Sequence, residues 1–254
     1  MPRKLLVFDL DDTLLNSDKK ISQKTKDVVW KCKEAGCDVA YITSRSTRRV
    51  GEFTKALPLD AVAYYNGARV YIKGQLNTCN EIPYQRGMAL IRSAQKKVPN
   101  LDVEACLEPI SYKKGKCLNL DTGELFTGNV EQGKDTPFQR ILFRSRHLTS
   151  SFLDEVDTEG LTVLFAADGT AVITDRQATK ENAMEIIAEA LRFCLKDVIA
   201  FGDDIADLNM LKHAGIGVAM GNAIASVKEA ADAVTETNDN DGAAVWLEHN
   251  LLMG

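Results

Sequence analysis

The stretch LLVFDLDDTLLNS, residues 5 to 17, joins an apolar run to a cluster of acids. The four apolar residues Leu5–Phe8 are typical of a buried strand. Three acids follow within four positions, at Asp9, Asp11 and Asp12. Carboxylates packed together at the end of a buried strand repel one another and lose hydration. The stretch therefore predicts an internal strand, followed by a cluster of charges whose cost another part of the protein has to offset.

Short apolar runs alternate with helical patterns in the first and last thirds of the chain. Ser22 is placed to cap a helix that runs to Ala35, with Gly36 as its stop signal. The segment Lys180–Cys194 repeats apolar side chains at helical spacing on one face. The segments that read as strands are Lys4–Phe8, Asp38–Thr43, Ala61–Tyr65, Val198–Phe201, Ile216–Ala219 and Ala233–Thr235. Strands that alternate with helices predict an α/β fold with a parallel sheet covered on both sides.

The middle of the chain, from about residue 83 to 175, has a different pattern. Its strand-like pieces are Leu101–Cys106, Lys116–Leu120, Arg140–Arg144, Thr162–Ala166 and Thr170–Thr174, and its helical pieces lie near Gln85–Val98 and Thr149–Glu155. Asp168-Gly169 stands between two of these strands and is a tight-turn signal. We therefore expect a core domain of residues 1–82 and 176–254, interrupted by an inserted α+β domain of residues 83–175.

Composition limits the classes of function that fit the chain. Its 254 residues include 45% hydrophobic and 26% charged residues, as is ordinary for a globular protein. A net charge of −5, without a cluster of Lys and Arg, argues against nucleic acid as a partner. The N-terminal apolar run is shorter than the roughly 7–15 residues of a signal-peptide core, and no stretch reaches the ~20 apolar residues of a membrane span. Six scattered cysteines without a CxxC pair favour reduced thiols, so we expect a cytoplasmic protein.

Polar side chains stand where the predicted core strands end. The carboxyl ends of parallel strands meet at one edge of a sheet, where functional groups gather. The polar groups in these places are Asp9, Thr43-Ser44-Arg45, Asn66-Gly67, and Asp203 with Asp207, and Lys180 opens the helix that leads into the fourth strand. Each feature alone is commonplace, because a lone DxD is usually a solvated turn and a Lys at a helix start usually lies on the surface. Their occurrence together, in this order, predicts one functional site.

Four stretches resemble the four motifs of the haloacid dehalogenase-superfamily phosphatases. They are DLDDT (9–13), the Thr of YITSR (41–45), the isolated Lys of ATKENA (178–183) and GDDIAD (202–207). The chain is most similar to the Cof-type sugar-phosphatase branch, which it also matches at YYNGARV (64–70), VAMGNA (218–223) and TNDNDG (237–242). The resemblance implies a Rossmann-like parallel-sheet core with a large α+β cap inserted between the second and third motifs. It also implies a phosphatase whose partner is a small phosphorylated metabolite, with sugar phosphates as the expected substrates.

The resemblance implies a role for each motif residue. Asp9 would be the nucleophile that attacks phosphorus and forms an aspartyl-phosphate. Asp11 can face the same side if the chain stays extended, and it would protonate the leaving group and then accept a proton from the attacking water. Thr43 and the backbone N–H of Ser44 would hold phosphoryl oxygens. Lys180 would neutralise charge between the nucleophile and the phosphate.

The resemblance also implies a Mg²⁺ ion, which prefers oxygen ligands and takes few of them from the protein. The expected ligands are the Asp9 carboxylate, the Asp11 carbonyl oxygen and Asp203, while Asp207 orders the metal waters or Lys180. The divalent cation and the lysine would together offset the crowding of carboxylates after the first strand. The residues expected to bind the substrate are Ser44, Arg45, Asn66 and Gly67.

Two positions depart from the family pattern. Ser44 stands where a Gly is usual in the second motif, and Ala206 stands where an Asn commonly precedes the last acid of the fourth motif. The Gly usually lets the backbone approach the phosphate, and the Asn offers a hydrogen bond near Asp203. Neither departure removes a charged catalytic group, so we expect a reduced or shifted activity at most.

Other functions share parts of this site. A phosphosugar mutase uses the same core. A response-regulator receiver also holds an aspartyl-phosphate with acids, a Thr or Ser, a Lys and Mg²⁺, but there the acid pair comes first along the chain. Here a DxD is followed by Thr, Lys and a late acid pair, and an inserted domain interrupts the chain. That order disfavours the receiver, and the intact acids and lysine argue against a catalytically silent binder of sugar phosphates.

Overall fold

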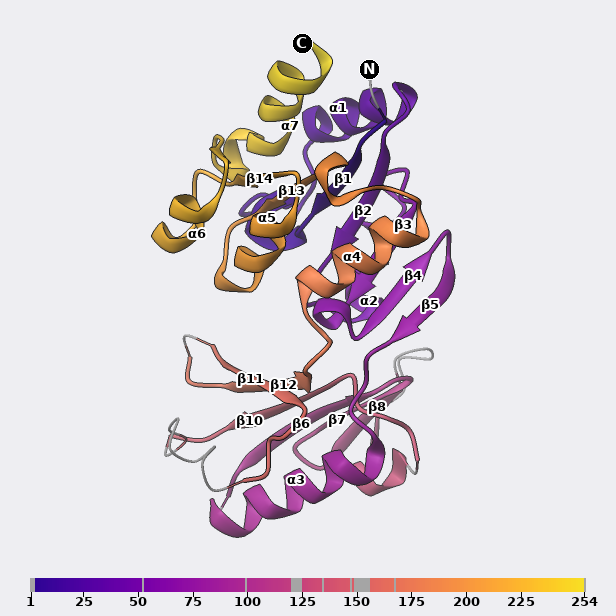
Figure 1. The fold of residues 1–254 in the computed structure, drawn as a ribbon. Coiled ribbons are helices and arrows are strands. Elements are labelled where there is room, and N and C mark those ends of the chain that lie inside the picture. Colours follow the sequence, from indigo (N-terminus) through magenta and orange to yellow (C-terminus); the bar gives the residue numbers. More distant parts are fainter. Residues whose placement is uncertain are drawn as a thin grey trace. The chain divides into compact units, whose positions relative to one another are not determined.

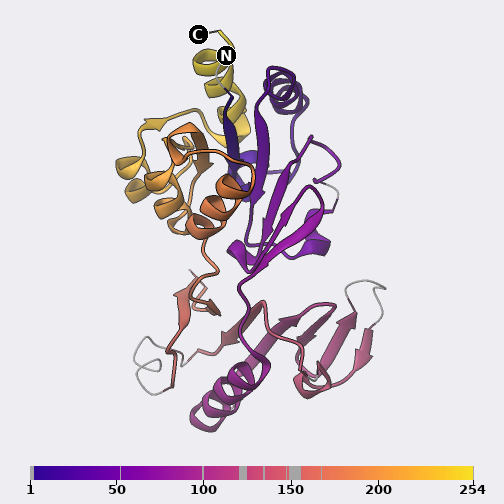
Figure 2. The ribbon, with the colours of Figure 1, turned by 45° about the vertical axis from the view of Figure 1, so that its right-hand side comes forward.

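The computed structural model describes residues 3–51, 53–98, 100–119, 125–133, 135–146, 148, 156–166 and 168–253. The chain divides into two compact units (Figures 1 and 2). The first unit combines Met1–Cys79 with Thr179–Gly254, and the second is Asn80–Ala178. The polypeptide therefore leaves the first unit after its fifth strand and returns to it directly before Lys180.

A single sheet organises the described part of the first unit. Its strands are β1 (Leu5–Phe8), β2 (Asp38–Ile42), β3 (Ala61–Tyr64), β4 (Arg69–Ile72), β5 (Gln75–Cys79), β13 (Val198–Gly202), β14 (Ile216–Ala219) and β15 (Ala233–Val234). They lie in the order β15-β14-β13-β1-β2-β3-β4-β5, and all neighbours from β15 to β3 are parallel. Every residue of the central strand β1 is buried, as expected for a strand covered on both faces. The predicted α/β fold is confirmed.

Helices cover both faces of this sheet. They are α1 (Gln23–Glu34), α2 (Thr47–Val50), α4 (Lys180–Ala190), α5 (Leu208–His213), α6 (Ala225–Ala230) and α7 (Gly242–Leu247). From β1 the chain moves through α1 to β2, whereas from β13 it moves through α5 to β14 in the opposite direction across the sheet. Right-handed crossovers then place α1 and α5 on opposite faces. Helix α1 packs against α7, and α4 packs against α5 (Figure 1).

The predicted boundaries of two helices can be compared with the structure. The Oγ atom of Ser22 accepts a hydrogen bond from the Thr25 N–H, so the predicted cap of α1 is confirmed. The predicted helix Lys180–Cys194 is too long, because α4 ends at Ala190. Arg192 takes a left-handed φ of 62°, and the Phe193 N–H donates to the Ala188 carbonyl. This closing motif usually carries Gly at the left-handed position, and an Arg there gives no stop signal in the sequence.

A hairpin next to β3 is absent from the sequence-based prediction. Strands β4 and β5 pair antiparallel and extend the sheet beyond β3. Lys73 and Gly74 join them with positive φ values of 49° and 79°. Two consecutive left-handed residues are the geometry of a type I′ turn, whose usual signal is Asn-Gly or Asp-Gly. Lys-Gly is a weaker form of that signal.

The second unit contains an antiparallel sheet and a long helix, α3 (Tyr84–Lys97). Its described strands are β6 (Asp102–Leu107), β7 (Ile110–Lys113), β8 (Lys116–Asn119), β9 (Leu125–Thr127), β10 (Arg140–Arg144), β11 (Leu161–Phe165) and β12 (Ala171–Asp175), in the order β11-β12-β10-β6-β7-β8-β9. Strands β7 and β9 were not predicted. The Asp168-Gly169 turn between β11 and β12 is confirmed, with Gly169 at a φ of 78°. The predicted helix Thr149–Glu155 lies outside the described residues.

Two further observations concern the membrane and the thiols. Within the described ranges, no helix has both the length and the apolar character needed to cross a bilayer. None of the six cysteines, all of which lie among the described residues, forms a disulfide, and only Cys79 and Cys194 are exposed. A cytoplasmic location stays a prediction.

Candidate active site

The carboxyl ends of β1 and β2 place two polar side chains in buried positions. Asp9 directly follows β1, and its N–H donates to the Phe201 carbonyl at 3.1 Å, which continues the pairing of β1 with β13. Only 6% of Asp9 is exposed. Thr43 directly follows β2, is fully buried, and is held by a backbone hydrogen bond to the Ala63 carbonyl at the end of β3. The sheet therefore holds both residues by its own hydrogen-bond ladder.

Lys180 lies between two of the predicted acids. Its Nζ is 2.8 Å from Asp9 Oδ1 and 2.7 Å from Asp207 Oδ1. All three side chains are buried. Thr179 caps α4 by accepting a hydrogen bond from the Asn182 N–H, so Lys180 is the first residue of a fixed helix. The structure thus brings the first, third and fourth motifs into direct contact.

Both carboxylate oxygens of Asp207 are bonded to the protein. Oδ1 contacts Lys180, and Oδ2 accepts hydrogen bonds from the N–H groups of Asp203 and Asp204, both at 3.1 Å. A Cβ atom at Gly202 would lie 2.5 Å from the Cβ of Asp207, so this close approach requires glycine. Asp207 is therefore suited to orient Lys180 and the loop after β13 rather than to bind an ion directly.

The site contains more buried carboxyl groups than cationic side chains to compensate them. Burial raises the pKa of Asp9 to about 8, although Lys180 acts in the opposite direction. Burial likewise raises the pKa of Asp203 to about 6, against a hydrogen bond from Thr13. The pKa of Lys180 is itself raised, because its two carboxylate partners outweigh the effect of its burial. Lys180 thus stays charged, but one ammonium does not neutralise three neighbouring acids.

These acids fit a small divalent cation. One carboxylate oxygen from each of Asp9, Asp203 and Asp207 lies within 4.8 Å of the other two. Mg²⁺ binds such hard oxygen ligands, usually one or two carboxylates together with phosphate and water. A cation there would also compensate the charge that Lys180 leaves over. Since Asp207 is already bonded to the protein, Asp9 and Asp203 are the side chains best placed to hold the ion.

Asp11 is paired with Arg45 in the structure. Arg45 Nε donates to Asp11 Oδ2 at 2.7 Å and Arg45 Nη2 donates to Asp11 Oδ1 at 2.6 Å, a bidentate ion pair. Partial burial raises the pKa of Asp11, but the hydrogen bonds and charge of Arg45 hold that pKa below its usual value. Asp11 is therefore a carboxylate here, and the head group of Arg45 is engaged with an acid.

The other residues that the sequence singled out are Ser44, Asn66 and Gly67, on the loops after β2 and β3, and Ala206, after β13. Asn66 has a buried Oδ1 atom without a hydrogen-bond partner among the described residues, so it offers an acceptor to a bound molecule. Gly67 packs against the first turn of α4. Ser44 is exposed and does not take a left-handed backbone that would need glycine. Ala206 lies in the short turn Ile205–Asp207.

Three further residues, without a role in the sequence-based prediction, hold the loops after β1 and β13. Thr13 Oγ1 donates to Asp203 Oδ1 at 2.6 Å, and Thr13 is buried. Asn222 Nδ2 donates to the Asp12 carbonyl, and its Oδ1 accepts from the Asn238 N–H. Asn238 Nδ2 reaches the Leu15 carbonyl. All three lie in the stretches DLDDT, VAMGNA and TNDNDG, which resemble the family's sequences. The sequence therefore marked these stretches but did not indicate which hydrogen bonds their side chains form.

Comparison with known proteins agrees with this geometry. The sequence profile of the haloacid dehalogenase-like hydrolases matches residues 6–247. The Bacillus subtilis protein YkrA is 30% identical over 259 residues, which is 96% of each chain. The 5-amino-6-(5-phospho-D-ribitylamino)uracil phosphatase YitU of the same species is 28% identical over 260 residues, again 96% of each.

Solved structures share the whole fold. BT1666 from Bacteroides thetaiotaomicron, described among phosphatases of the haloalkanoate superfamily, has a TM-score of 0.83 and 25% identity over 97% of this chain and 94% of that one. The sugar phosphatase BT4131, of subclass IIB, has a TM-score of 0.79 over 97% of this chain and 98% of its own, and at 22% identity it supports the fold alone. The family that the four motifs predicted is confirmed: this chain belongs to the haloacid dehalogenase-like hydrolases and is an enzyme of their phosphatase type.

Proposed function

We propose that the chain is a Mg²⁺-dependent phosphatase that hydrolyses small phosphomonoesters, sugar phosphates above all, through an aspartyl-phosphate on Asp9. The observation that carries this proposal is the buried contact of Lys180 with Asp9 and Asp207, beside Asp203. A purely structural ion pair needs only one acid beside Lys180, but three acids lie together here. A surplus of buried carboxylates has a function if a cation and a phosphate share the site.

The chain's own residues divide the reaction into two steps. A carboxylate oxygen of Asp9 attacks phosphorus in line, the bond from phosphorus to the alkoxide oxygen breaks, and Asp11 gives the leaving oxygen a proton. Water then attacks phosphorus, its proton passes to Asp11, and the acyl-phosphate bond breaks to release phosphate and restore Asp9. Lys180 and Thr43 stabilise the charge on the phosphoryl oxygens. Mg²⁺, held by Asp9 and Asp203, with the Asp11 carbonyl as the third expected ligand, would neutralise phosphoryl charge when bound.

Metal affinity is expected to rise with pH. In the metal-free site the pKa of about 8 for Asp9 keeps a proton on this carboxyl near neutral pH, and the pKa of about 6 for Asp203 adds a second one only toward pH 6; a cation competes with these protons. Mg²⁺ has to displace them, so its apparent dissociation constant should fall from pH 6 to pH 8, by up to about tenfold per pH unit for each proton displaced. The measurement is a Mg²⁺ titration of activity at several pH values, after removal of metal with EDTA.

A second acidic group provides the control for this titration. Glu181, Glu185 and His213 also bring ligand atoms within 4.8 Å of one another, on the surface of α4 and α5. Glu185→Gln should leave the apparent dissociation constant for Mg²⁺ unchanged, whereas Asp203→Asn should increase it. Full turnover in metal-free buffer, or an affinity independent of pH, would contradict the proposed site.

Replacing Asp11 should affect substrates unequally. Asp11→Asn should lower kcat by roughly 10²–10⁴-fold for alkyl phosphates, the usual contribution of general acid–base catalysis. The loss should be smallest for p-nitrophenyl phosphate, whose leaving group needs little protonation. Since Asp11 is ion-paired with Arg45, that pair has to open before Asp11 can carry a proton. Equal losses on alkyl and aryl phosphates, measured as kcat, would show that Asp11 has only a structural role.

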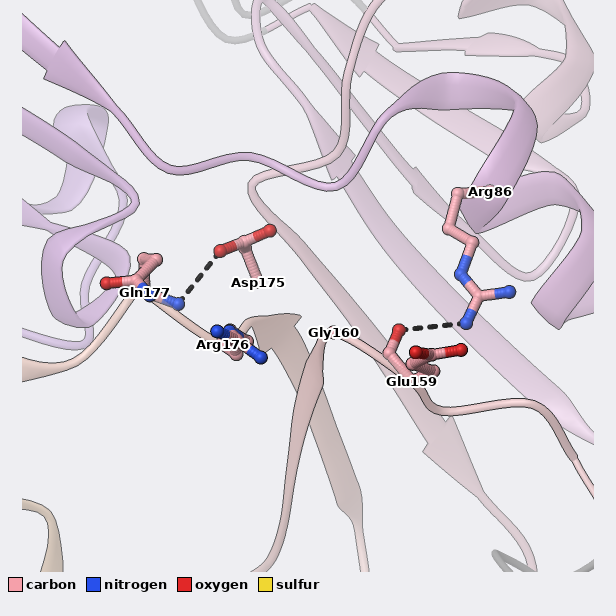
Figure 3. Close-up of a pocket in the computed structure, with 6 residues that line it drawn as sticks. All are labelled: Arg86, Glu159, Gly160, Asp175, Arg176 and Gln177. Atoms are coloured by element: carbon pink, nitrogen blue, oxygen red, sulfur yellow. Dashed lines mark hydrogen bonds between the residues drawn. The ribbon is translucent and has the colours of Figure 1, made fainter.

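A pocket in the second unit suits a hydroxyl-rich group. It is largely open to solvent, has a volume of about 480 Å³, and is lined by Arg86, Glu159, Gly160, Asp175, Arg176 and Gln177 (Figure 3). Arg86 already binds the Asp157 carboxylate and donates to the Glu159 carbonyl at 2.9 Å. Two basic and two acidic side chains offer donors and acceptors without a net positive charge. This lining favours a neutral polyol over a polyanion as the organic part of the substrate.

We assign the second unit the role of a cap that reads this organic group. It joins the first unit by two crossings, at Cys79–Asn80 and at Ala178–Thr179. Two linkers that flank a compact insertion permit hinge motion, so the cap can exclude water during the reaction and release the product afterwards. Arg45 and Asn66 would assist from the core. The relative YitU is a phosphatase whose substrate carries a phospho-D-ribityl group, which supports a phosphorylated polyol as the substrate of this chain.

Product analysis tests the proposal and its alternatives together. The chain is incubated with Mg²⁺ and a panel of phosphorylated metabolites that includes hexose, pentose and polyol phosphates, with Asp9→Asn as the blank. Release of free phosphate, fastest from sugar or polyol phosphates, is the expected result. An isomerised phosphosugar without free phosphate would identify a mutase instead, and a phosphoprotein that persists without turnover would identify a receiver-like protein.

A further inference from the structure

We propose that Gly67 is a positioning residue: the turn Tyr65–Gly67 braces the first turn of α4 and thereby fixes Lys180 between Asp9 and Asp207. The inference rests on the proposed catalytic role of Lys180. It replaces substrate binding, which the sequence predicted for Gly67, with a mechanical role. It also explains why this glycine stands on a loop after β3, outside the four motifs.

The turn has an unusual backbone. Tyr65, Asn66 and Gly67 take successive positive φ values of 52°, 58° and 108°. Residues other than glycine rarely adopt this conformation, and it persists where surrounding contacts enforce it. Two hydrogen bonds hold it to the loop after β2, from the Tyr65 N–H to the Arg45 carbonyl at 3.1 Å and from the Asn66 N–H to the Thr43 carbonyl at 2.8 Å. The turn is thus tied to the predicted phosphate-binding loop.

On its other side the turn touches the start of α4. A Cβ atom at Gly67 would lie 2.7 Å from the Thr179 carbonyl oxygen and 2.9 Å from the Ala183 Cβ. Real Cβ atoms do not approach so closely, so the contact exists only because residue 67 has no side chain. The Thr179 carbonyl also accepts the hydrogen bond from the Ala183 N–H, at 3.0 Å, that closes the first turn of the helix.

Lys180 lies inside the turn of helix that Gly67 contacts. Thr179 precedes it, Ala183 lies on the next turn, and its own Nζ reaches Asp9 and Asp207 at 2.8 and 2.7 Å. A side chain at position 67 has to push the Thr179 carbonyl or Ala183 outward, and Lys180 moves with them. Catalytic groups tolerate displacements of only about 0.5 Å, and a 1 Å misplacement can cost about 10²-fold in rate. One three-residue turn therefore sets the spacing of Thr43 and Lys180.

Gly67→Ala tests the contact, and Gly36→Ala is its matched control. Gly36 has a similar φ of 96°, but a Cβ atom there would meet nothing within 4 Å. Both variants bear the backbone strain, and only Gly67→Ala bears the clash. We expect both to lose thermal stability, while Gly67→Ala alone lowers kcat, by about 10–10²-fold, with KM for the sugar phosphate changed less than about threefold. A KM change as large as the kcat change would instead favour direct substrate binding and overturn the inference.

A second-site substitution tests whether Gly67→Ala lowers kcat by displacing the start of α4. Ala183→Gly in the Gly67→Ala background removes one of the two clashing atoms and should restore part of kcat. Where Gly67→Ala does not fold, Ala183→Gly alone is compared with Ala188→Gly, a buried position further along α4. Both place a glycine in the helix, and only the first opens a gap against Gly67, so only the first should lower kcat, by several-fold.

The outcomes separate this inference from the proposed function. If the unmodified enzyme releases no phosphate from any substrate, the proposed function fails before Gly67 is examined. If it is active and Gly67→Ala retains its kcat, the positioning role is wrong while the function stands. The positioning role is equally wrong if Gly36→Ala loses as much kcat as Gly67→Ala, or if Ala183→Gly and Ala188→Gly are indistinguishable.

Discussion

Replacing Asp9 by asparagine is expected to lower kcat by on the order of 10⁴–10⁶-fold, the range found when an enzyme loses a residue of its nucleophilic machinery. The amide cannot form the acyl-phosphate, and no other described carboxylate contacts Lys180 from the end of β1. The loss should be equally severe for alkyl and aryl phosphates, because the first step of both needs the nucleophile. The measurement is phosphate release in single- and multiple-turnover assays with Mg²⁺.

The same variant should remain folded, which separates chemistry from stability. Burial raises the pKa of Asp9, so the ionised carboxylate is less favourable in the metal-free folded protein than in the unfolded chain. Asparagine resembles the neutral form in size and keeps an oxygen near Lys180. In metal-free buffer at neutral pH, the free energy of unfolding should therefore be unchanged or increased. A folded Asp9→Asn protein that turns over at the wild-type rate would disprove the nucleophile assignment.

Lys180→Ala is the second change with a large expected effect. Losing one preorganised donor at a developing charge typically costs about 10²–10³-fold in rate, and kcat should fall by more because two buried carboxylates also lose their cation. Breaking a buried pair from one side costs about 3–5 kcal/mol of stability. Without the ammonium the pKa of Asp9 should rise further, so the folded state binds more protons than the unfolded chain. The variant's stability should then fall as pH rises from about 4 toward 8.

Two control variants show whether the effect of Lys180→Ala comes from the loss of its buried charge. Lys212→Ala removes an exposed lysine from α5 and should change neither rate nor stability appreciably. Lys180→Met keeps the aliphatic length without the charge and should be as inactive as Lys180→Ala. Added Mg²⁺ should restore part of the lost stability in both Lys180 variants, because a bound cation compensates the same carboxylates. Near-wild-type activity in Lys180→Ala would show that this lysine is not the catalytic one.

The core of the site was predictable because its signals are local in sequence. Asp9, Thr43 and Asp203 each stand directly after an apolar run, and parallel strands bring their carboxyl ends together whatever the loops between them do. The helix that begins at Lys180 followed from the helical spacing of the apolar side chains after it. These features need only the periods of strands and helices.

Other features depend on tertiary contacts that no local pattern encodes. The bidentate pair of Asp11 with Arg45 joins side chains from different loops, so the sequence showed two functional candidates without their mutual orientation. Arg192 ends α4 in a conformation usually taken by glycine. The packing of Gly67 against Thr179 could not be predicted from the sequence, because a glycine is equally compatible with a tight turn, a ligand contact or close packing against a helix.

The most direct test of the proposed mechanism is to trap phosphate on Asp9. The wild-type protein is mixed with Mg²⁺ and a rapidly hydrolysed phosphate ester labelled in its phosphoryl group, quenched in acid within the first turnover, and digested. This mechanism predicts label on the peptide that contains Asp9. Hydroxylamine should release the label, as it does from an acyl-phosphate, and Asp9→Asn should carry none. Full phosphate release with no labelled peptide at any quench time, or with the label on another residue, would contradict it.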